Sequence, residues 1–230
     1  MTWVKICGMT NLEDALVAVD AGANAVGFVF YDKSPRCVTV ETAREICAKL
    51  PEDVEKVGVF VGATPEEMTK ASNRIGLTVA QIYTDSRGRL AKIDDDFYRK
   101  AQCDVIIALP FEALHAGKNG EPNTFFLSAA TFRRILAVLI DSGSSERPGG
   151  TGEKFNWEHA PFVREGMKRV GASLILAGGL TSENVVDAIA AFQPWGVDVA
   201  SGVEASPGKK DPEKVRAFVR AVRELDRRAS

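Results

Sequence analysis

Eight short runs of apolar, mostly β-branched residues recur along the chain at a nearly even spacing. They lie at residues 4–7, 25–30, 56–61, 78–82, 104–109, 135–140, 173–177 and 196–200. Most of them are continuously apolar rather than alternating, which is typical of parallel strands that are covered on both faces. The spacing of about 28 residues per strand–helix unit accounts for nearly the whole chain and favours a (β/α)₈ barrel, also called a TIM barrel.

Helix start signals occupy the segments between these runs. Thr10 with Glu13, and Thr64 with Glu67, have the spacing of a capping box, in which a hydroxyl and a carboxyl satisfy the first backbone N–H groups. Residues 211–212, Asp-Pro, open the last helical pattern in a similar way. Strands and helices therefore alternate, as a parallel α/β fold requires.

A single barrel domain over residues 1–230 fits this pattern best. A doubly wound sheet would also alternate strands and helices, but eight evenly spaced units without a dinucleotide fingerprint favour a closed barrel. The fifth unit is expected to be irregular, because residues 111–127 contain glycines and a proline and only a short helix near 128–134 can be placed. No linker or low-complexity segment divides the chain.

Composition excludes several classes of function. The net charge is -2, which gives no global field for nucleic acid or an anionic membrane surface, and no apolar run is long enough to span a bilayer. Residues 1–5 do not resemble a secretory signal, so we expect a cytoplasmic protein with reduced thiols. Four cysteines without a Cys-x-x-Cys pair, and two distant histidines, disfavour a disulfide scaffold and a zinc site.

In such a barrel the active site lies where the strands end. Cys7 ends the first predicted strand and Asp141 directly follows the sixth. A cysteine in this place is more often inert core, and an aspartate is as often a loop residue or helix cap. A thiol with a lowered pKa could instead act as a base, and a buried carboxyl facing it across the barrel could act as an acid.

Glycine turns follow the seventh and eighth predicted strands. Gly178 and Gly179 lie in the first, and Ser201 and Gly202 in the second. Their backbone N–H groups could hold a phosphate, and barrels often bind phosphate at this place, although tight turns alone would need the same glycines. Arg36, after the second strand, suits a substrate carboxylate, and a glycine-rich loop at 149–157 is expected to close over a ligand.

Taken together, these segments resemble the phosphoribosylanthranilate isomerase family of tryptophan biosynthesis. The resemblance runs through nearly the whole chain and is carried by the order and spacing of Lys5-Ile6-Cys7-Gly8, Asn24–Phe30, Ser34-Pro35-Arg36, Gly58–Val61, Leu139-Ile140-Asp141, Gly149–Gly152, Phe155-Asn156-Trp157, Leu176–Leu180 and Asp198–Glu204. No single motif is decisive.

The resemblance implies an Amadori rearrangement of an aminoaldose phosphate to an aminoketose phosphate. Asp141 would be the general acid that opens the furanose ring, and Cys7, as a thiolate, the general base that takes the C2′ proton. The reaction would need no metal and no organic cofactor. By position, Arg36 and Asp198 would line the anthranilate and sugar side. Residues Gly178, Gly179, Ser201 and Gly202 would hold the phosphate.

Two departures from the family pattern lie in one quarter of the barrel. The family usually reads Gln-Leu-His-Gly at the end of the fourth strand, where this chain has Gln81-Ile82-Tyr83-Thr84, and residues 108–127 do not follow the usual pattern. A paralogue acting on another aminoaldose phosphate therefore stays open, as does a non-catalytic barrel that binds a phosphorylated sugar. The sequence does not choose between a monomer and a homodimer.

Overall fold

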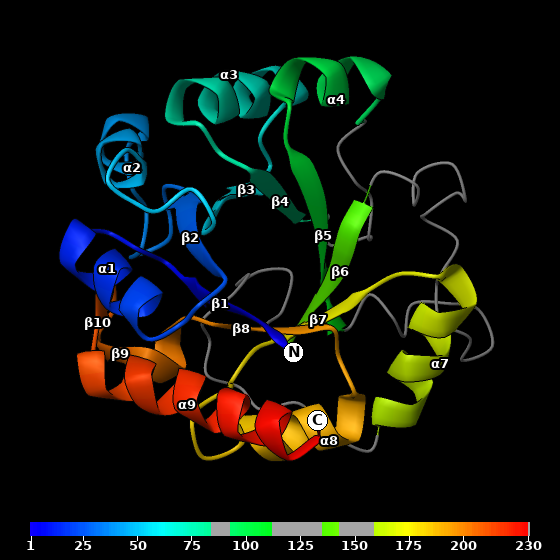
Figure 1. Ribbon diagram of the computed structural model, residues 1–230. Coiled ribbons are helices and arrows are strands. Elements are labelled where there is room, and N and C mark those ends of the chain that lie inside the picture. The colour runs from blue at the N-terminus through cyan, green and yellow to red at the C-terminus, as the bar shows by residue number, and fades with distance from the viewer. Residues whose placement is uncertain (84–92, 112–134, 143–158, 230) are drawn as a thin grey trace.

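Eight parallel strands close into a barrel in chain order, and β8 pairs back onto β1 (Figure 1). The strands are β1 (Trp3–Cys7), β2 (Ala25–Phe30), β3 (Glu55–Val61), β4 (Val79–Tyr83), β5 (Asp104–Pro110), β6 (Ile135–Asp141), β7 (Leu174–Ala177) and β8 (Gly196–Val199). The computed structural model describes residues 1–83, 93–111, 135–142 and 159–229. The predicted (β/α)₈ barrel is confirmed, with each strand boundary within one residue of its expected place.

Helices surround the barrel on the outside, as Figure 1 shows. Those described are α1 (Leu12–Asp20), α2 (Val40–Cys47), α3 (Pro65–Ile75), α4 (Asp95–Ala101), α7 (Ala160–Val170), α8 (Val185–Phe192) and α9 (Pro212–Ala229). After β8 come a 3₁₀ turn, η4 (Ser201–Val203), and a small antiparallel pair, β9 (Glu204–Ser206) and β10 (Lys209–Lys210). Within the described ranges, no helix has the length and apolar character to cross a membrane.

Alternate residues of each strand face different layers, which explains the continuously apolar runs. On β1, Val4 and Ile6 pack in the core between strands and helices, whereas Trp3 belongs to the cluster inside the barrel. Lys5 shares the inward side with Trp3 and is fully buried. A lysine ammonium inside a barrel must have a partner, because an isolated buried charge is very costly.

Two of the three expected helix starts are confirmed. Thr64 and Glu67 form the capping box of α3, and Asp211 accepts hydrogen bonds from two backbone N–H groups at the start of α9. The capping box predicted at Thr10 and Glu13 is wrong: Asn11 caps α1, and the Thr10 hydroxyl donates to the carbonyl of Gly208 instead. A tertiary contact has displaced the local one.

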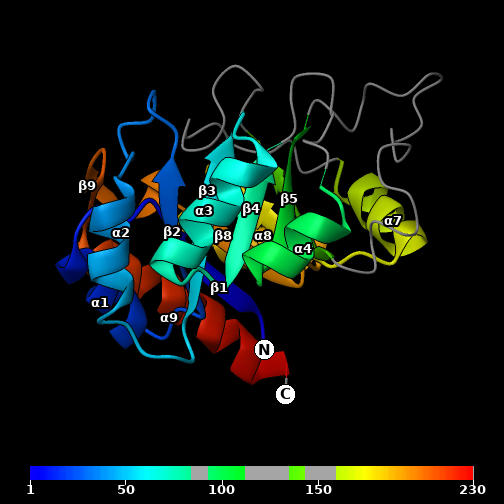
Figure 2. The ribbon, with the colours of Figure 1, turned by 90° about the horizontal axis from the view of Figure 1, so that it is seen from above.

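The carboxyl ends of the strands point to one end of the barrel. In Figure 2 the arrowheads of β2, β3 and β4 point to one side, and both chain termini lie at the other. The site must therefore be sought in the segments that follow the strands. The irregular fifth unit expected at 111–127, its short helix near 128–134 and the loop at 149–157 lie wholly or almost wholly outside the described residues.

Candidate functional site

One pocket at the carboxyl ends of the strands brings together every residue that the sequence marked as a candidate. Its lining includes Cys7, Arg36, Asp141, Gly178, Gly179, Asp198, Ser201 and Gly202. These residues come from β1, the loop after β2, the end of β6, the turn after β7, and β8 with the turn that follows it. Cys7 and Asp141 lie on strands three places apart around the barrel, so the candidate base and the candidate acid come from different sides of the pocket.

Cys7 lies at the end of β1 with only 7% of its surface exposed. Opposite it, β2 carries Gly27, where a Cβ would come within 2.8 Å of the Cys7 Sγ and 3.3 Å of the Lys5 Nζ. The missing side chain makes the space in which thiol and ammonium meet. The Lys5 ammonium also forms an ion pair with Asp198, at 2.9 Å between Nζ and Oδ1.

The expected lowering of the Cys7 pKa is not found. Burial raises the pKa of the thiol above its ordinary value, while the ammonium groups of Lys5 and Lys210 act in the opposite direction. For Lys5, burial would lower the pKa, but the charges of Asp198 and Cys7 outweigh it and raise the pKa. Lys5 is therefore a permanent cation beside the thiol.

Asp141 ends β6 and is 3% exposed. The Tyr83 hydroxyl, at the end of β4, donates a 2.9 Å hydrogen bond to its Oδ2. Burial and then the neighbouring Asp141 charge raise the pKa of Tyr83 well above its ordinary value, so the phenol remains a donor. The residue that departs from the family pattern thus contacts the candidate acid directly.

The glycine turns after β7 and β8 lie against each other. A Cβ on Gly202 would collide with the carbonyl oxygen of Leu180, so only glycine allows this approach. The Asn184 side chain accepts from the Thr181 N–H at 2.8 Å and donates to the Gly179 carbonyl at 2.9 Å, which fixes the first turn. Within the described residues, the N–H groups of Gly178 and Gly179 have no hydrogen-bond acceptor. Two adjacent turns with spare N–H groups can bind an anion.

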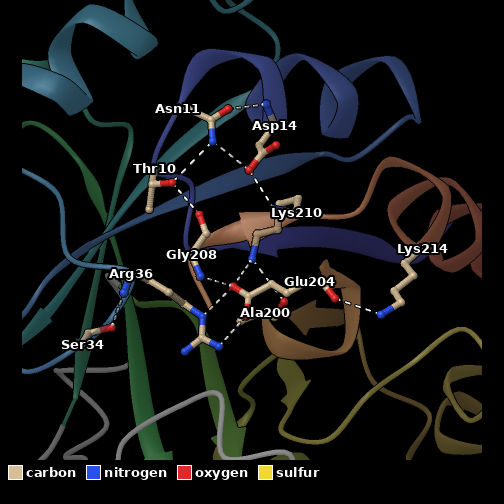
Figure 3. A network of polar contacts seen from close by, with 10 residues as sticks. All are labelled: Thr10, Asn11, Asp14, Ser34, Arg36, Ala200, Glu204, Gly208, Lys210 and Lys214. Atoms are coloured by element: carbon tan, nitrogen blue, oxygen red, sulfur yellow. Dashed lines mark hydrogen bonds and ion pairs between the residues drawn. The ribbon is translucent and has the colours of Figure 1, made fainter. Parts of the chain in front are cut away.

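Arg36 forms a buried cluster with Glu204 and Lys210, shown in Figure 3. The guanidinium donates to the Glu204 carboxylate from Nε at 2.8 Å and from Nη2 at 2.7 Å, and the Lys210 Nζ lies 3.0 Å from Glu204 Oε1. Burial would raise the pKa of Glu204, but the hydrogen bonds from Arg36 and the Lys210 charge outweigh it and lower the pKa. We call these three residues the Arg36–Glu204–Lys210 cluster.

This cluster is tied to α1 through β10. The Lys210 backbone N–H donates to the Asp14 carboxylate at 2.8 Å, and the Asn11 amide holds the same carboxylate at 2.9 Å (Figure 3). The Gly208 carbonyl accepts from the Thr10 hydroxyl. The β9–β10 hairpin therefore joins the start of α1 to the wall of the pocket.

Sequence reasoning missed Lys5, Glu204 and Lys210. A signal for Lys5 was present, since it stands two residues before Cys7 on a buried strand and must share its face. No local signal could have identified Glu204, because its partner Arg36 lies 168 residues away in the chain.

The remaining cysteines do not line this pocket. Cys47 lies on α2, where burial raises its pKa to about 12, and burial likewise raises the pKa of Cys37 and of Cys103. Among the residues with described positions, no group of three or more histidine, cysteine or acidic side chains is arranged to hold a metal ion.

Comparison with known proteins gives a consistent result. A family model described as N-(5'phosphoribosyl)anthranilate (PRA) isomerase matches residues 4–221. The chain is 44% identical to the N-(5'-phosphoribosyl)anthranilate isomerase of Pseudomonas fluorescens, over 95% of this chain and 97% of that protein. It is 40% identical to the enzyme of the same name from Citrifermentans bemidjiense, over 98% of each chain.

Solved structures agree with the sequence comparisons. The crystal structure of phosphoribosyl anthranilate isomerase from Thermotoga maritima matches with a TM-score of 0.76 and 35% identity, over 97% of this chain and all of the other. Another crystal structure, of a phosphoribosyl anthranilate isomerase in complex with reduced 1-(o-carboxyphenylamino)-1-deoxyribulose 5-phosphate, matches with a TM-score of 0.72 and 34% identity over the same shares.

Proposed function

The chain belongs to the N-(5'-phosphoribosyl)anthranilate isomerase family, and from this premise we propose that Cys7 is its general base and Asp141 its general acid. The enzyme isomerises N-(5-phosphoribosyl)anthranilate to 1-(2-carboxyphenylamino)-1-deoxyribulose 5-phosphate in tryptophan biosynthesis. The reaction moves hydrogen from C2′ to C1′ of the sugar without net oxidation. It therefore needs one group that gives a proton and one that removes a proton.

In the proposed sequence, Asp141 protonates the furanose ring oxygen, the C1′–O bond breaks, and the anthranilate nitrogen forms a Schiff base with C1′. The Cys7 thiolate then removes the C2′ proton, which gives an enolamine. Protonation at C1′ and loss of the hydroxyl proton at C2′ complete the ketone. Acid–base catalysis of this kind contributes about 10²–10⁴-fold for each group, so binding and positioning must supply much of the rest.

Lys5 supports the proposed role of Cys7. A buried thiol resists ionisation, and an adjacent ammonium is the kind of group that stabilises a thiolate in a site of low dielectric. The ammonium is itself balanced by Asp198, at 2.9 Å. In this proposal Asp198 lines the sugar side of the pocket and also keeps Lys5 charged.

Substrate binding is divided between the two ends of the pocket. The phosphate is assigned to the backbone N–H groups of Gly178, Gly179, Ser201 and Gly202. The anthranilate carboxylate is assigned to the Arg36 guanidinium, which can donate two parallel hydrogen bonds to it. The sugar then lies between these anchors, next to Cys7 and Asp141.

The observation that carries the proposal is that all eight assigned residues line one pocket. The test is the loss of substrate fluorescence with purified protein. Cys7→Ser and Asp141→Asn are expected to lower kcat by about 10²-fold or more with little change in KM. Cys37→Ser, which changes a thiol outside the pocket, is the matched control and should keep wild-type activity.

Three results would count against the proposal. A Cys7→Ser or Asp141→Asn variant with nearly full kcat would remove that residue from the mechanism. Faster turnover of an aminoaldose phosphate with another aglycone would make the chain a paralogue with a different substrate. Binding of the reduced product without any turnover would point to the non-catalytic barrel.

We also propose the domain organisation, the cellular location and the oligomeric state of the protein. We place residues 1–230 in one barrel domain and the protein in the cytoplasm, where the other steps of amino-acid biosynthesis would supply its substrate. The enzyme of Thermotoga maritima is described as dimeric. This chain is proposed to be a monomer or a homodimer, and light scattering coupled to size-exclusion chromatography separates the two.

A further inference from the structure

Arg36 lies at the mouth of the barrel, but its side chain is buried and held by several contacts. Its residue surface is 8% exposed, and its side-chain stem passes over Gly8, where a Cβ would come within 2.6 Å of the Arg36 Cδ. On one edge, Nε and Nη2 donate to the two carboxylate oxygens of Glu204. Stem and head are both fixed, so the side chain has a single orientation.

A guanidinium has more than one edge that can bind a carboxylate. Its five N–H groups form a rigid planar fork, and the pair with Glu204 uses the Nε–Nη2 edge. Within the part of the chain that the structure describes, no acceptor contacts Nη1, so the Nη1–Nη2 edge can bind a second planar anion. Since Arg36 lines the pocket, this second edge is what it can offer to a bound carboxylate.

The charge of the cluster is also suited to an anionic ligand. The Glu204 carboxylate accepts from Lys210 Nζ at 3.0 Å and from the Gly208 N–H at 3.3 Å, in addition to Arg36. One carboxylate thus lies between two cations, and the cluster keeps a net positive charge. Glu204 can orient Arg36 without cancelling its attraction for a ligand.

We propose that Glu204 is a positioning residue that aligns the second edge of the Arg36 guanidinium with the aglycone carboxylate. This inference rests on the proposed function and deepens it, because it explains how the pocket selects an aglycone that carries a carboxylate. Glu204 directly follows the 201–203 turn in the chain. The same residue therefore connects the carboxylate end of the pocket to its phosphate end.

Glu204→Gln tests the inference because the amide keeps the size of the side chain. One of its two positions becomes an N–H donor facing another donor of Arg36, so the bidentate pair is lost. Two effects then oppose each other: Arg36 loses its alignment, and the cluster gains positive charge. Alignment predicts weaker binding of a carboxylate ligand, whereas charge alone predicts tighter binding.

The experiment measures Kd by calorimetry for two probes. One is reduced 1-(2-carboxyphenylamino)-1-deoxyribulose 5-phosphate, and the other is its phenylamino counterpart without the carboxylate. Glu204→Gln is expected to weaken the first by about 10- to 100-fold and the second by less than about threefold. With substrate, KM should rise while kcat changes less.

Lys214→Met is the matched control. The Lys214 Nζ donates to the backbone carbonyl of Glu204 at 2.9 Å, so this change removes a contact to the same residue without touching its carboxylate. It should leave both Kd values at the wild-type level. Circular dichroism and thermal melts establish that each variant is folded.

Several results would overturn the inference. Equal weakening of both probes would make Glu204 a purely structural residue, and tighter binding of the carboxylate probe would show that charge outweighs alignment. If Glu204→Gln does not fold, Arg36→Met is compared with Arg36→Met/Glu204→Gln, in which both charges of the pair are gone. The two should bind the carboxylate probe equally, and a further loss in the double variant would contradict the proposal.

Failure of the inference can be distinguished from failure of the proposed function. Turnover of phosphoribosylanthranilate by the wild-type protein tests the function, and the wild-type preference for the carboxylate probe tests Arg36. Only the change in that preference in Glu204→Gln tests Glu204.

Discussion

The Tyr83 hydroxyl donates a 2.9 Å hydrogen bond to the Oδ2 of Asp141. This bond joins the ends of β4 and β6 inside the pocket, across the intervening β5. A donor to a carboxylate favours its ionised form, so Tyr83 acts directly on the proton that Asp141 is proposed to deliver. The phenol is a stable donor, because burial and the Asp141 charge keep its pKa well above the ordinary value.

Tyr83→Phe is expected to shift the pH dependence of the reaction. Without the donor, the protonated form of Asp141 persists to higher pH, and the descending limb of the kcat profile should move up by about half to one pH unit. Tyr31→Phe removes a phenol from the same pocket that has no hydrogen bond to Asp141, and should leave that limb in place. If the descending limb of the kcat profile stays in place in Tyr83→Phe, the Tyr83–Asp141 hydrogen bond does not affect catalysis.

Lys5→Met is expected to make Cys7 harder to ionise. The pKa of the thiol is already raised by burial, so kcat/KM should rise with pH through the neutral range as the thiolate forms. Removing the ammonium moves this ascending limb to higher pH and costs about tenfold in activity at neutral pH for each unit of displacement. The ultraviolet absorbance of the thiolate follows the same titration.

A buried lysine elsewhere controls for the stability cost of Lys5→Met. Lys56 on β3 is 8% exposed, and its Nζ donates to the Pro51 carbonyl. Lys56→Met should lower the melting temperature without moving the ascending limb. If both variants shift the limb alike, the effect of Lys5 is not electrostatic.

Gly27→Ala should disturb the proposed base, Cys7, without touching the proposed acid, Asp141. The new Cβ would need the space now occupied by the Cys7 Sγ and the Lys5 Nζ. Displacing the thiol is expected to lower kcat by about tenfold or more, because small errors in position are costly in catalysis. Overpacking also lowers stability, by about 1–3 kcal/mol.

Gly62→Ala provides a variant of comparable stability for this test. Gly62 has φ of 71° and no atom near the place of a Cβ, so alanine there adds backbone strain alone. It should reduce the melting temperature and keep kcat. If Gly27→Ala and Gly62→Ala lose kcat equally, the effect of Gly27→Ala is due to general destabilisation and not to displacement of the thiol.

Asp226→Asn is expected to loosen the junction between the last helix and the first strand. Both Asp226 carboxylate oxygens accept from the Thr2 N–H, at 3.0 and 3.1 Å, and Arg223 approaches to 3.2 Å. The loss is about 1 kcal/mol at neutral pH, or a decrease in Tm of about 2–4 °C. Glu213→Gln, in an exposed pair on the same helix, should change Tm much less.

The sign of the pH dependence follows from the lowered pKa of Asp226. Burial alone would raise this pKa, but the hydrogen bonds from Thr2 and the Arg223 charge outweigh it. A carboxyl with a lowered pKa in the folded state stabilises above its unfolded value, and this stabilisation is lost as the pH falls through the folded value. The difference between wild type and Asp226→Asn should therefore vanish in acid.

The fold was predictable because it depends on patterns that repeat. Most strands are apolar along most of their length, since one side packs inside the barrel and the other against helices, and eight repeats leave little choice of architecture. The Thr10 capping box failed for the opposite reason. A single contact with Gly208, 198 residues away, was worth more than the local hydrogen bond.

The site was predictable only in part. Strand ends are recognisable in the sequence, so the residues that follow them could be collected as candidates. Lys5 could have been included by its spacing of two from Cys7. Tyr83 was noticed as a departure, but its bond to Asp141 joins two strands that are not neighbours in the barrel, and no local pattern encodes such a contact.

The pairing of β8 with β1, which closes the barrel, has a consequence for folding during translation. Lys5 and Cys7 are synthesised long before the partner of Lys5, Asp198, which lies on β8. Until that strand is free to pair with β1, the cation beside the thiol has no counter-ion and the first strand has an open edge. A nascent chain thus carries its proposed base on β1 but has no complete pocket until β8 has been translated.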